Sequence, residues 1–286
     1  MLKRSTIQLL RFHFSLFLLP IYLFALSQAS DINWLNASIA FIVLHLLVYP
    51  SSNGYNSYMD RDETPIGGLE HPLKPTRQLY YATIFLDIAA ILLSFLINTT
   101  FVLCIVLYIL ASRAYSYRGI RLKRFPVIGF LTVFIFQGAL VYFSVYQAVE
   151  GSTTHHFWLT CSIASLLIGS LYPLTQIYQH EADRRDGVIT ISYLLGKRNT
   201  FLFSIFLFSG ASVLLYLLFS GQEELDLFML YLLITLPVVL FFLYWMRQVW
   251  LNAQAANFKN SLRMNVIATM CTTTYFIILI LLKQIE

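Results

Sequence analysis

The chain has 286 residues, of which 58% are hydrophobic and 12% are charged, and its mean hydropathy is +0.69. Because soluble domains carry about 25% charged residues, this composition excludes an ordinary soluble enzyme and indicates an integral membrane protein. The formal net charge of +5 comes from basic residues placed between apolar segments. We interpret it as a feature of membrane topology and expect no nucleic-acid partner.

Apolar segments long enough to cross a hydrocarbon core of about 30 Å recur along the whole chain. Since lipid cannot hydrogen-bond the backbone, each of them is expected to be helical. The nine predicted spans are 12–29, 34–51, 79–97, 100–115, 127–147, 157–178, 201–220, 227–246 and 265–282. They leave no stretch for a soluble domain, so residues 1–286 are predicted to form one all-α polytopic membrane domain.

The basic residues alternate with the spans. Eighteen of the 19 Lys and Arg residues precede the first span or follow the second, fourth, sixth and eighth spans, whereas only Lys283 follows the ninth. By the positive-inside rule, the N-terminus and these basic loops are cytoplasmic and the C-terminus is outside. The sequence therefore predicts a multi-pass protein of the plasma membrane, which is the inner membrane in a cell with two.

The longest polar loop follows the second span, and carboxylates gather at its start. Asn56, Asp60 and Glu63 are spaced i, i+4 and i+7, so a helix continued from the span would present all three on one face. Pro65 and the glycines and prolines after it are expected to end that helix. Taken alone, the loop is equally well interpreted as a solvated, charged helix end.

A second polar loop follows the sixth span and repeats this chemistry. Gln176, Gln179, Asp183 and Asp186 are spaced i, i+3, i+7 and i+10. Two acidic helix ends that met with nothing between them would repel each other, and a divalent cation that prefers oxygen ligands would remove the repulsion. Neighbouring Arg and Lys residues can bind the remaining charge of a diphosphate. Together the two loops favour a site for a magnesium-bound diphosphate.

Three segments resemble motifs of the UbiA-type intramembrane prenyltransferase family. Asn56-Ser57-Tyr58-Met59-Asp60 is similar to the NxxxD opening of the first aspartate-rich motif. Asp183-Arg184-Arg185-Asp186-Gly187, followed by Thr190 and Leu195-Gly196, is similar to the second motif. A third segment lies between these two motifs and is similar to the family's tyrosine-to-lysine segment. It contains Tyr115-Ser116-Tyr117, Lys123, Pro126 and Gly129.

Two positions depart from the family's pattern. Thr64 stands where the first motif usually has its second aspartate, so Glu63, or less comfortably Asp62, would have to supply that carboxylate. Gln179 stands four residues before Asp183, where the second motif usually has an aspartate. A Gln side chain can still ligate Mg²⁺ through its carbonyl oxygen, but it brings less charge.

The resemblance implies an enzyme, a prenyltransferase in which nine helices surround a central cavity that opens to the cytoplasm. The family transfers a prenyl group from a polyprenyl diphosphate to a lipophilic acceptor, such as an aromatic compound or a quinone precursor, with Mg²⁺ as cofactor. Asp60 and Asp183 are implied to be catalytic. The implied metal ligands are Asn56, Asp60, Glu63, Gln179 and Asp183, with Asp62, Gln176 and Asp186 as second choices. The implied diphosphate contacts are Lys123, Arg184, Asn56, Lys74 and Arg77.

Two other functions remain open from the sequence. A non-catalytic relative that binds a prenyl lipid would account for Thr64 and Gln179. A small-molecule transporter would need ionisable residues near the membrane midplane in related halves of the chain, and Asp87 in the third span is nearly alone in such a position. Because a carboxylate there is costly, Asp87 is either functional or bonded to a neighbouring helix.

Overall fold

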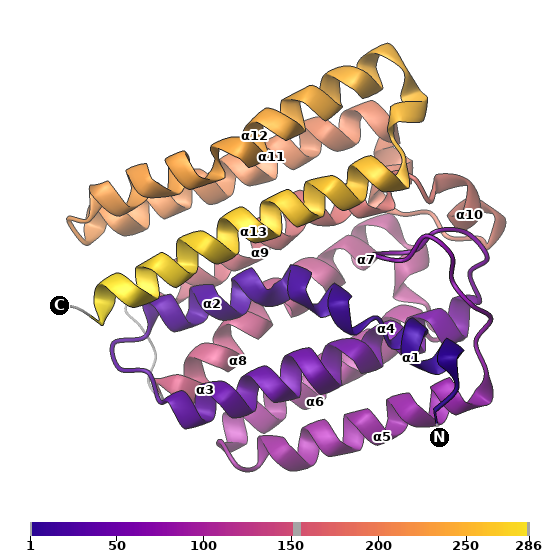
Figure 1. Ribbon diagram of the computed structural model, residues 1–286, viewed down its shortest axis with the longest axis horizontal. Helices are drawn as coiled ribbons and strands as arrows, with labels where there is room; N and C mark the ends of the chain where they lie inside the picture. The colour runs from indigo at the N-terminus through magenta and orange to yellow at the C-terminus, as the bar shows by residue number, and fades with distance from the viewer. Residues whose placement is uncertain (1, 151–155, 285–286) are drawn as a thin grey trace.

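Long helices run side by side through the protein, and short loops join them at two opposite ends (Figure 1). The computed structural model describes residues 2–150 and 156–284. Within these residues, eight helical segments are long and apolar enough to cross a membrane. They are Arg4–Gln28, Trp34–Asp60, Thr99–Ser116, Pro126–Val149, Phe157–Gln176, Ile191–Gly221, Leu225–Leu251 and Phe258–Lys283. The prediction of an all-helical, polytopic membrane protein is thereby confirmed.

The remaining predicted span, 79–97, corresponds to helix α5 (Arg77–Ser94), which packs against its neighbours α4 (Tyr49–Asp60) and α6 (Thr99–Ser116). Its 18 residues are long enough for a span, although α5 is not among the eight segments that are also apolar enough by composition. Counting α5 with the eight segments above gives the nine helices that the sequence predicted.

Two of the segments are interrupted at left-handed backbone conformations. In the first segment, Arg11 has φ 46° and separates α1 (Arg4–Leu10) from the 3₁₀ helix η1 (Phe12–Leu18), which continues into α2 (Leu19–Gln28). In α11 (Ile191–Gly221), Gly196 has φ 74° and divides the helix into two parts. Glycine adopts this conformation without steric cost, so the Leu195-Gly196 pair has a backbone role here.

Two segments contain π-helical turns, which the sequence does not predict. The second segment runs through α3 (Trp34–Phe41), the π-helical η2 (Ile42–Val48) and α4. The fourth runs through α7 (Pro126–Val133), the π-helical η4 (Phe134–Ala139) and α8 (Leu140–Val149). Wide turns of this kind are frequent at functional sites because they redirect side chains, and η4 carries two of the residues that line the cavity described below.

The later part of the chain follows the same pattern. Helix α9 (Phe157–Gln176) leads through a turn into the short α10 (His180–Arg185), and α12 (Leu225–Leu251) leads through η5 (Ala253–Ala255) into α13 (Phe258–Lys283). Helices α11 and α13 begin at side chains that accept a hydrogen bond from the first turn, Thr190 and Asn257 respectively.

Aromatic packing closes the end of the bundle that lies away from the polar loops. Phe24 of α2 lies between Tyr142 of α8 and Phe276 of α13, with ring centroids 4.9 and 5.1 Å apart. All three side chains are almost fully buried. Burial on this scale excludes water from that end of the bundle, so a polar site has to lie at the other end.

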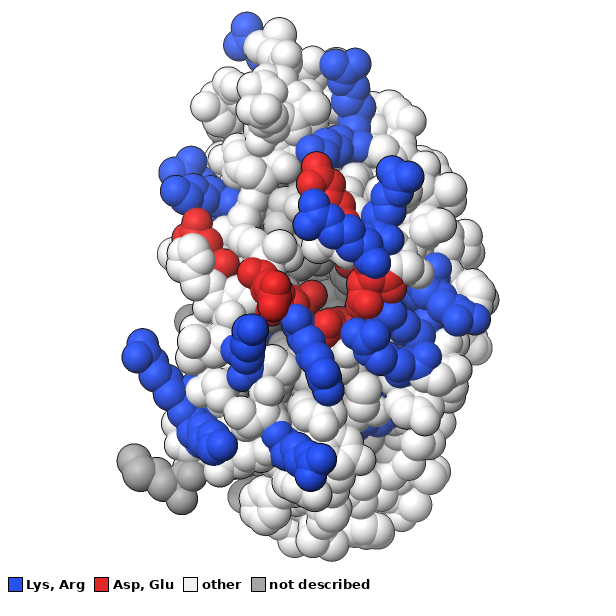
Figure 2. Space-filling model, turned by 90° about the vertical axis from the view of Figure 1, so that its right-hand side faces the viewer, with Lys and Arg blue, Asp and Glu red and all other residues white. Residues whose placement is uncertain are grey.

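The charged loops meet at that other end, as the alternation of basic residues predicts. The N-terminus, α1 and α10 lie together on the right in Figure 1. Figure 2 looks onto this end and shows Lys and Arg side chains around a central group of Asp and Glu side chains, beside a hollow in the surface. The arrangement thus gathers the acidic loops at one end of the helices.

Candidate active site

A cavity of about 180 Å³ lies at the charged end, between α4, α6, η4 and α9 and beneath the loop that follows α4. Its mouth is lined by the carboxylates of Asp60, Asp62 and Asp183 and by the cations Arg11 and Lys123. The sequence places these residues in four separate regions of the chain. The fold brings them together because the ends of α4, α6 and α9 meet at this end of the bundle.

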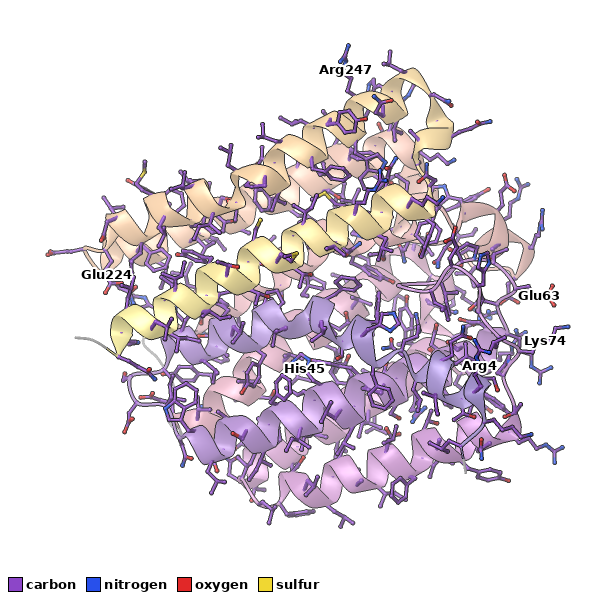
Figure 3. All side chains as sticks on the ribbon, viewed as in Figure 1. Arg4, His45, Glu63, Lys74, Glu224 and Arg247 are labelled. Atoms are coloured by element: carbon purple, nitrogen blue, oxygen red, sulfur yellow. The ribbon has the colours of Figure 1, made fainter. Side chains whose placement is uncertain are left out.

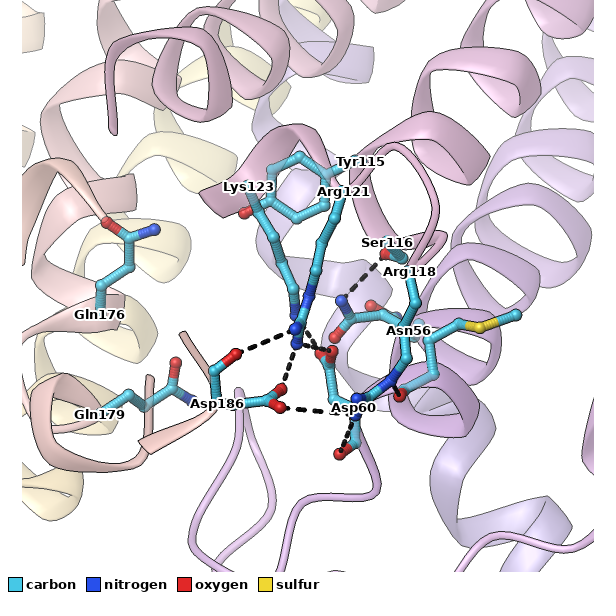
Figure 4. Close-up of polar contacts among 12 residues, drawn as sticks. Asn56, Asp60, Tyr115, Ser116, Arg118, Arg121, Lys123, Gln176, Gln179 and Asp186 are labelled. Atoms are coloured by element: carbon cyan, nitrogen blue, oxygen red, sulfur yellow. Dashed lines mark hydrogen bonds and ion pairs between the residues drawn. The ribbon is translucent and has the colours of Figure 1, made fainter. Parts of the chain in front are cut away.

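Asp60 is the last residue of α4, and its side chain is 6% exposed. Its carboxylate accepts hydrogen bonds from Lys123 Nζ and from Arg121 Nη2, the latter at 3.2 Å (Figure 4). The predicted catalytic aspartate is therefore buried and paired with two cations that follow α6.

Arg121 joins the two acidic loops. It has φ 51°, is 8% exposed, and donates to the Asp186 carboxylate and, at 3.0 Å, to the Asp186 carbonyl oxygen, as well as to Asp60. Arg118 lies 3.5 Å from the other Asp186 oxygen. Asp186, a second-choice metal ligand, is thus bound by arginines, and it is not among the described residues that line the cavity.

The other two cavity carboxylates are poorly neutralised. Burial raises the pKa of the Asp183 carboxyl to about 7; Lys123 opposes the shift, and Asp60 and Asp62 add to it. Burial and the Asp60 carboxylate raise the pKa of Asp62 to about 6, whereas Lys123 and Arg11 lower it. In addition, Asp183 Oδ2 is buried without a hydrogen-bond partner. Carboxylates in this state favour the arrival of further positive charge.

Three side-chain amides complete the mouth. Asn56 donates to Ser116 Oγ at 3.0 Å, and Gln179 donates to the carbonyl oxygen of Pro65 at 3.3 Å. Gln176 donates to the Tyr172 hydroxyl at 2.8 Å, while its own Oε1 is buried without a partner. All three amides line the cavity, Asn56 from α4 and Gln176 and Gln179 from the end of α9 and the turn that follows it.

Besides Asp186, four of the implied site residues lie outside the cavity. Glu63 is 77% exposed and pairs at 3.7 Å with Lys74, which is 90% exposed, and both project from the edge of the molecule (Figure 3). Arg77 and Arg184 are exposed as well. Glu63 misses the site because α4 ends at Asp60, where Arg61 has φ 56°, so the i+7 spacing no longer describes a helix face. Asp62 lines the cavity in its place.

Arg11 is a cavity residue that the sequence did not single out. It is 5% exposed and donates to the carbonyl oxygens of Gly67 at 3.1 Å and Asn53 at 3.2 Å. Its Nε is buried without a partner. In the sequence, Arg11 is only one of the basic residues that indicate the membrane orientation. No local pattern marks it as a site residue, because its hydrogen-bond partners lie more than 40 residues away.

Asp87, the carboxylate within a predicted span, pairs with another intramembrane residue. Arg113 Nε donates to Asp87 Oδ2 at 3.0 Å, and Ser51 Oγ donates to Asp87 Oδ1 at 2.6 Å. Neither Asp87 nor Arg113 is among the described residues that line the cavity. The pair therefore ties α5 to α6 and α4, which agrees with the interpretation of Asp87 as an acid bonded to a neighbouring helix.

The comparisons with known proteins agree with this geometry. The sequence model of the UbiA prenyltransferase family matches residues 16–267. The chain belongs to the UbiA prenyltransferase family. The predicted family is thereby confirmed, and so is the prediction that the protein is an enzyme that transfers prenyl groups. No curated protein was found to match the sequence.

Solved structures share the UbiA fold over nearly the whole chain. A UbiA homolog from Archaeoglobus fulgidus, bound to DMAPP and Mg²⁺, is 17% identical with a TM-score of 0.72, and the match covers 96% of this chain and 99% of that one. A UbiA homolog from Aeropyrum pernix K1 is 18% identical with a TM-score of 0.69, over 94% and 98%. A digeranylgeranylglyceryl phosphate synthase is 19% identical with a TM-score of 0.61, over 97% of both.

A second cavity in this UbiA family member is apolar and has a volume of about 460 Å³. Helix α9 separates the two cavities, since Tyr172 and Gln176 line the first one and Leu171 and Leu174 line the second. The other walls of the second cavity come from α2, α11, α12 and α13. Its lining includes one buried hydroxyl without a partner, that of Ser204.

Proposed function

We propose that this UbiA family member transfers the prenyl group of a polyprenyl diphosphate to a lipophilic acceptor within the membrane, with Mg²⁺ as cofactor. The observation that carries the proposal is the mouth of the cavity, where the buried Asp60 carboxylate and the half-buried carboxylates of Asp62 and Asp183 face the same space beside Arg11 and Lys123. Carboxylates alone would bind a metal ion, and cations alone would bind a phosphate. A site with both suits a diphosphate that arrives with its metal.

The donor groups at the mouth are of the type that Mg²⁺ requires, namely carboxylate and amide oxygens. The unpartnered Asp183 Oδ2 and the raised pKa of Asp62 and Asp183 indicate a site that lacks positive charge. Within the described residues, no three His, Cys, Asp or Glu side chains stand close enough together to enclose a metal ion, and Asp60 is paired with Lys123 instead. Binding of a metal therefore requires these side chains to rearrange.

Asp60, Asp62 and Asp183 would hold the metal, with the Asn56 and Gln179 amide oxygens as further ligands. When bound, Mg²⁺ neutralises the negative charge that develops on the departing diphosphate. This assignment replaces Glu63 by Asp62. The solved structures of the Archaeoglobus fulgidus homolog, bound to Mg²⁺ with DMAPP or with GPP, support the choice of ion and donor.

Lys123 and Arg11 would bind the diphosphate oxygens, because they are the two cations that line the described cavity. In the reaction, the bond between the allylic carbon and the diphosphate oxygen breaks, and the electron pair leaves with the diphosphate. The acceptor then forms a new bond to that carbon and loses a proton to the released diphosphate. Tyr115, Tyr172 and Phe136 line the space where the allylic cation forms, and their rings stabilise it while little water is present.

The apolar chain of the donor requires a different environment from its diphosphate. A volume of about 180 Å³ with many polar groups in its wall offers no room for a long chain, since pockets for drug-sized ligands span roughly 300–1,000 Å³. We assign the chain to the apolar cavity beyond α9. Phe14 lines the first cavity and Phe17 lines the second, and their ring centroids lie 5.1 Å apart, so the chain would pass from one cavity to the other beside η1.

The positive-inside rule gives the orientation in this proposal: the charged end and its cavity mouth face the cytoplasm of a cell bounded by the plasma membrane. Attachment of a membrane-impermeant maleimide to single cysteines placed at Glu63 and at Glu223 tests it in intact cells. We expect labelling at position 223 only, and labelling at position 63 alone would reverse the orientation.

The function is tested by diphosphate release from a panel of prenyl diphosphates, with and without Mg²⁺, using purified protein in detergent or nanodiscs. The wild type is compared with Asp60→Asn and Asp183→Asn, and Glu63→Gln serves as a matched control that removes a carboxylate outside the cavity. Metal-dependent release that both cavity variants abolish and Glu63→Gln retains would support the proposal. A folded wild type that binds no prenyl diphosphate would refute it and leave a lipid-binding relative or a transporter.

A further inference from the structure

The inner part of the first cavity is polar but uncharged. We call this part the recess, and its lining includes Ser52, Tyr108, Ser112, Thr132, Phe136 and Gln137. Ser52 precedes Asp60 by eight residues on the same helix, which corresponds to about 12 Å along its axis. The recess therefore lies two turns deeper in the bundle than the carboxylates of the mouth.

Among the residues that the structure describes, no charged side chain lines the recess. Both cations that line the described cavity, Arg11 and Lys123, belong to the mouth, where Lys123 is paired with Asp60 and Arg11 is bonded to backbone carbonyl groups. Arg113 of α6 is turned toward Asp87 instead. A second anion could reach a cation only beside the diphosphate, where the two negative charges would repel each other.

Hydroxyl and amide groups surround the recess and the passage that leads to it. The Ser52 and Ser112 hydroxyls are hydrogen-bonded at 2.7 Å, and the Tyr108 hydroxyl interacts with Ser52 and Gln137. Gln137 lies in the π-helical turn η4, which directs it into the cavity. These groups already bond one another, so they form a neutral polar wall.

One acceptor atom on the mouth side of the recess is unused. The Tyr115 and Tyr172 hydroxyls are hydrogen-bonded to each other, and Gln176 donates to Tyr172. Gln176 is 7% exposed, and its Oε1 is buried without a partner although the residue lines the cavity. A buried carbonyl oxygen in this state favours a ligand that donates a hydrogen bond.

We propose that the acceptor is a small, uncharged molecule that carries a hydroxyl group, and that it binds in the recess with this hydroxyl donating to Gln176 Oε1. Burial of a carboxylate or phosphate deep in the bundle without a cation is far more costly than burial of a hydroxyl that finds a partner. The cavity volume of about 180 Å³ limits the bound part of the acceptor to roughly one ring. This inference rests on the proposed prenyl transfer and names the class of its second substrate.

Equilibrium binding tests the charge preference without requiring turnover. Protein loaded with Mg²⁺ and geranyl thiodiphosphate, a donor analogue that reacts slowly, is titrated with matched phenols of increasing size. Each pair consists of a hydroxybenzamide and the corresponding hydroxybenzoate, which differ in charge but hardly in shape. We expect the amide of at least one pair to bind about tenfold or more tightly than its acid. Equal or tighter binding of the acids, or no binding of any amide to loaded protein, would overturn the proposal.

Failure of the analogue itself to bind would instead refute the proposed transferase function, so the two failures are distinguishable. Two further variants locate the acceptor. Gln176→Leu should weaken amide binding about tenfold, and Gln176→Asn, which keeps a carbonyl oxygen, should restore part of it. Gln137→Lys places a cation in the recess and should shift the preference toward the acid. Each variant is first checked for affinity toward the Mg²⁺-loaded analogue, which a merely misfolded protein would lose.

Discussion

The guanidinium group of Arg121 lies 3.2 Å from Asp60 and also donates to Asp186, so one side chain joins the ends of the two acidic loops. Lys123 pairs with the same Asp60 carboxylate. In this arrangement the protein's own cations neutralise part of the acidic site. A metal-bound diphosphate would bring both charges that the site needs, positive charge for the carboxylates and negative charge for Lys123.

Asp62 and Glu63 are adjacent in the chain but differ in position, and this difference gives a matched pair of variants. Asp62 lines the cavity, whereas Glu63 is 77% exposed. Asp62→Asn should weaken Mg²⁺-dependent binding of prenyl diphosphate on the order of tenfold or more, because it removes one of three cavity carboxylates. Glu63→Gln should change it less than about twofold. Binding is measured with a non-hydrolysable donor analogue, and a larger effect of Glu63→Gln would contradict the assignment.

The pH dependence of Mg²⁺ binding follows from the raised pKa of Asp62 and Asp183, about 6 and about 7 in the folded protein against an ordinary value of 3.8. At pH values between these, the two carboxyl groups keep their protons in the metal-free folded state, whereas the unfolded chain has released them. Its free energy of unfolding therefore falls as the pH rises from about 4 to 7. Mg²⁺ binds only the deprotonated carboxylates, so its affinity changes in the opposite direction.

We expect the apparent Mg²⁺ affinity to rise about tenfold or more between pH 5.5 and 7.5. The measurement is the increase in thermal unfolding temperature on adding Mg²⁺ at each pH. Asp183→Asn should flatten the dependence, because the remaining Asp62 titrates about one unit lower. An Mg²⁺ effect that is the same at both pH values would show that these carboxyls do not bind the ion.

The ion pair of Asp87 with Arg113 should matter for stability, since their side chains are only 14% and 20% exposed. Asp87→Leu or Arg113→Met alone leaves an unpaired charge within the bundle and should cost about 3–5 kcal/mol. The double variant removes both charges and should cost less than either single change. Unfolding midpoints in a detergent titration provide the comparison, and additive losses would show that the two residues act independently.

The apolar cavity beyond α9 should set the length of donor that binds well. Ser209 is an exposed residue of its lining, so Ser209→Phe fills space without replacing a buried group. We expect this variant to bind a long-chain donor analogue about tenfold more weakly and to bind dimethylallyl thiodiphosphate as the wild type does. Equal weakening of both ligands would place the chain elsewhere.

The sequence predicted those parts of the fold that depend on local patterns. The lengths of the apolar segments and the alternation of basic loops located nine helices. A span must be long enough to cross the hydrocarbon core, and the basic residues that flank the spans follow the membrane orientation. Motif spacing grouped Asn56 with Asp60, and Gln176 and Gln179 with Asp183, and these residues line the cavity. The grouping was possible because each stretch is helical apart from one turn, so residues at helical spacing lie near one another. These residues could be found without knowing how the helices pack.

Other residues could not be placed from the sequence, because their positions depend on where a helix ends or on contacts between distant parts of the chain. Glu63 was expected on the face of α4, but Arg61 ends that helix, and the carboxylate that reaches the cavity is Asp62. Arg11 enters the site through bonds to Asn53 and Gly67, which no spacing within the first span reveals. The π-helical turns that carry His45 and Gln137 have no signature in a single sequence.

The most direct test of the proposed function is diphosphate release from prenyl diphosphates by the purified wild type and by Asp60→Asn and Asp183→Asn, with Mg²⁺ and with a chelator. We expect diphosphate release that requires Mg²⁺, that both substitutions abolish and that Glu63→Gln retains. Release that persists in the chelator, or that survives removal of either cavity carboxylate, would contradict it.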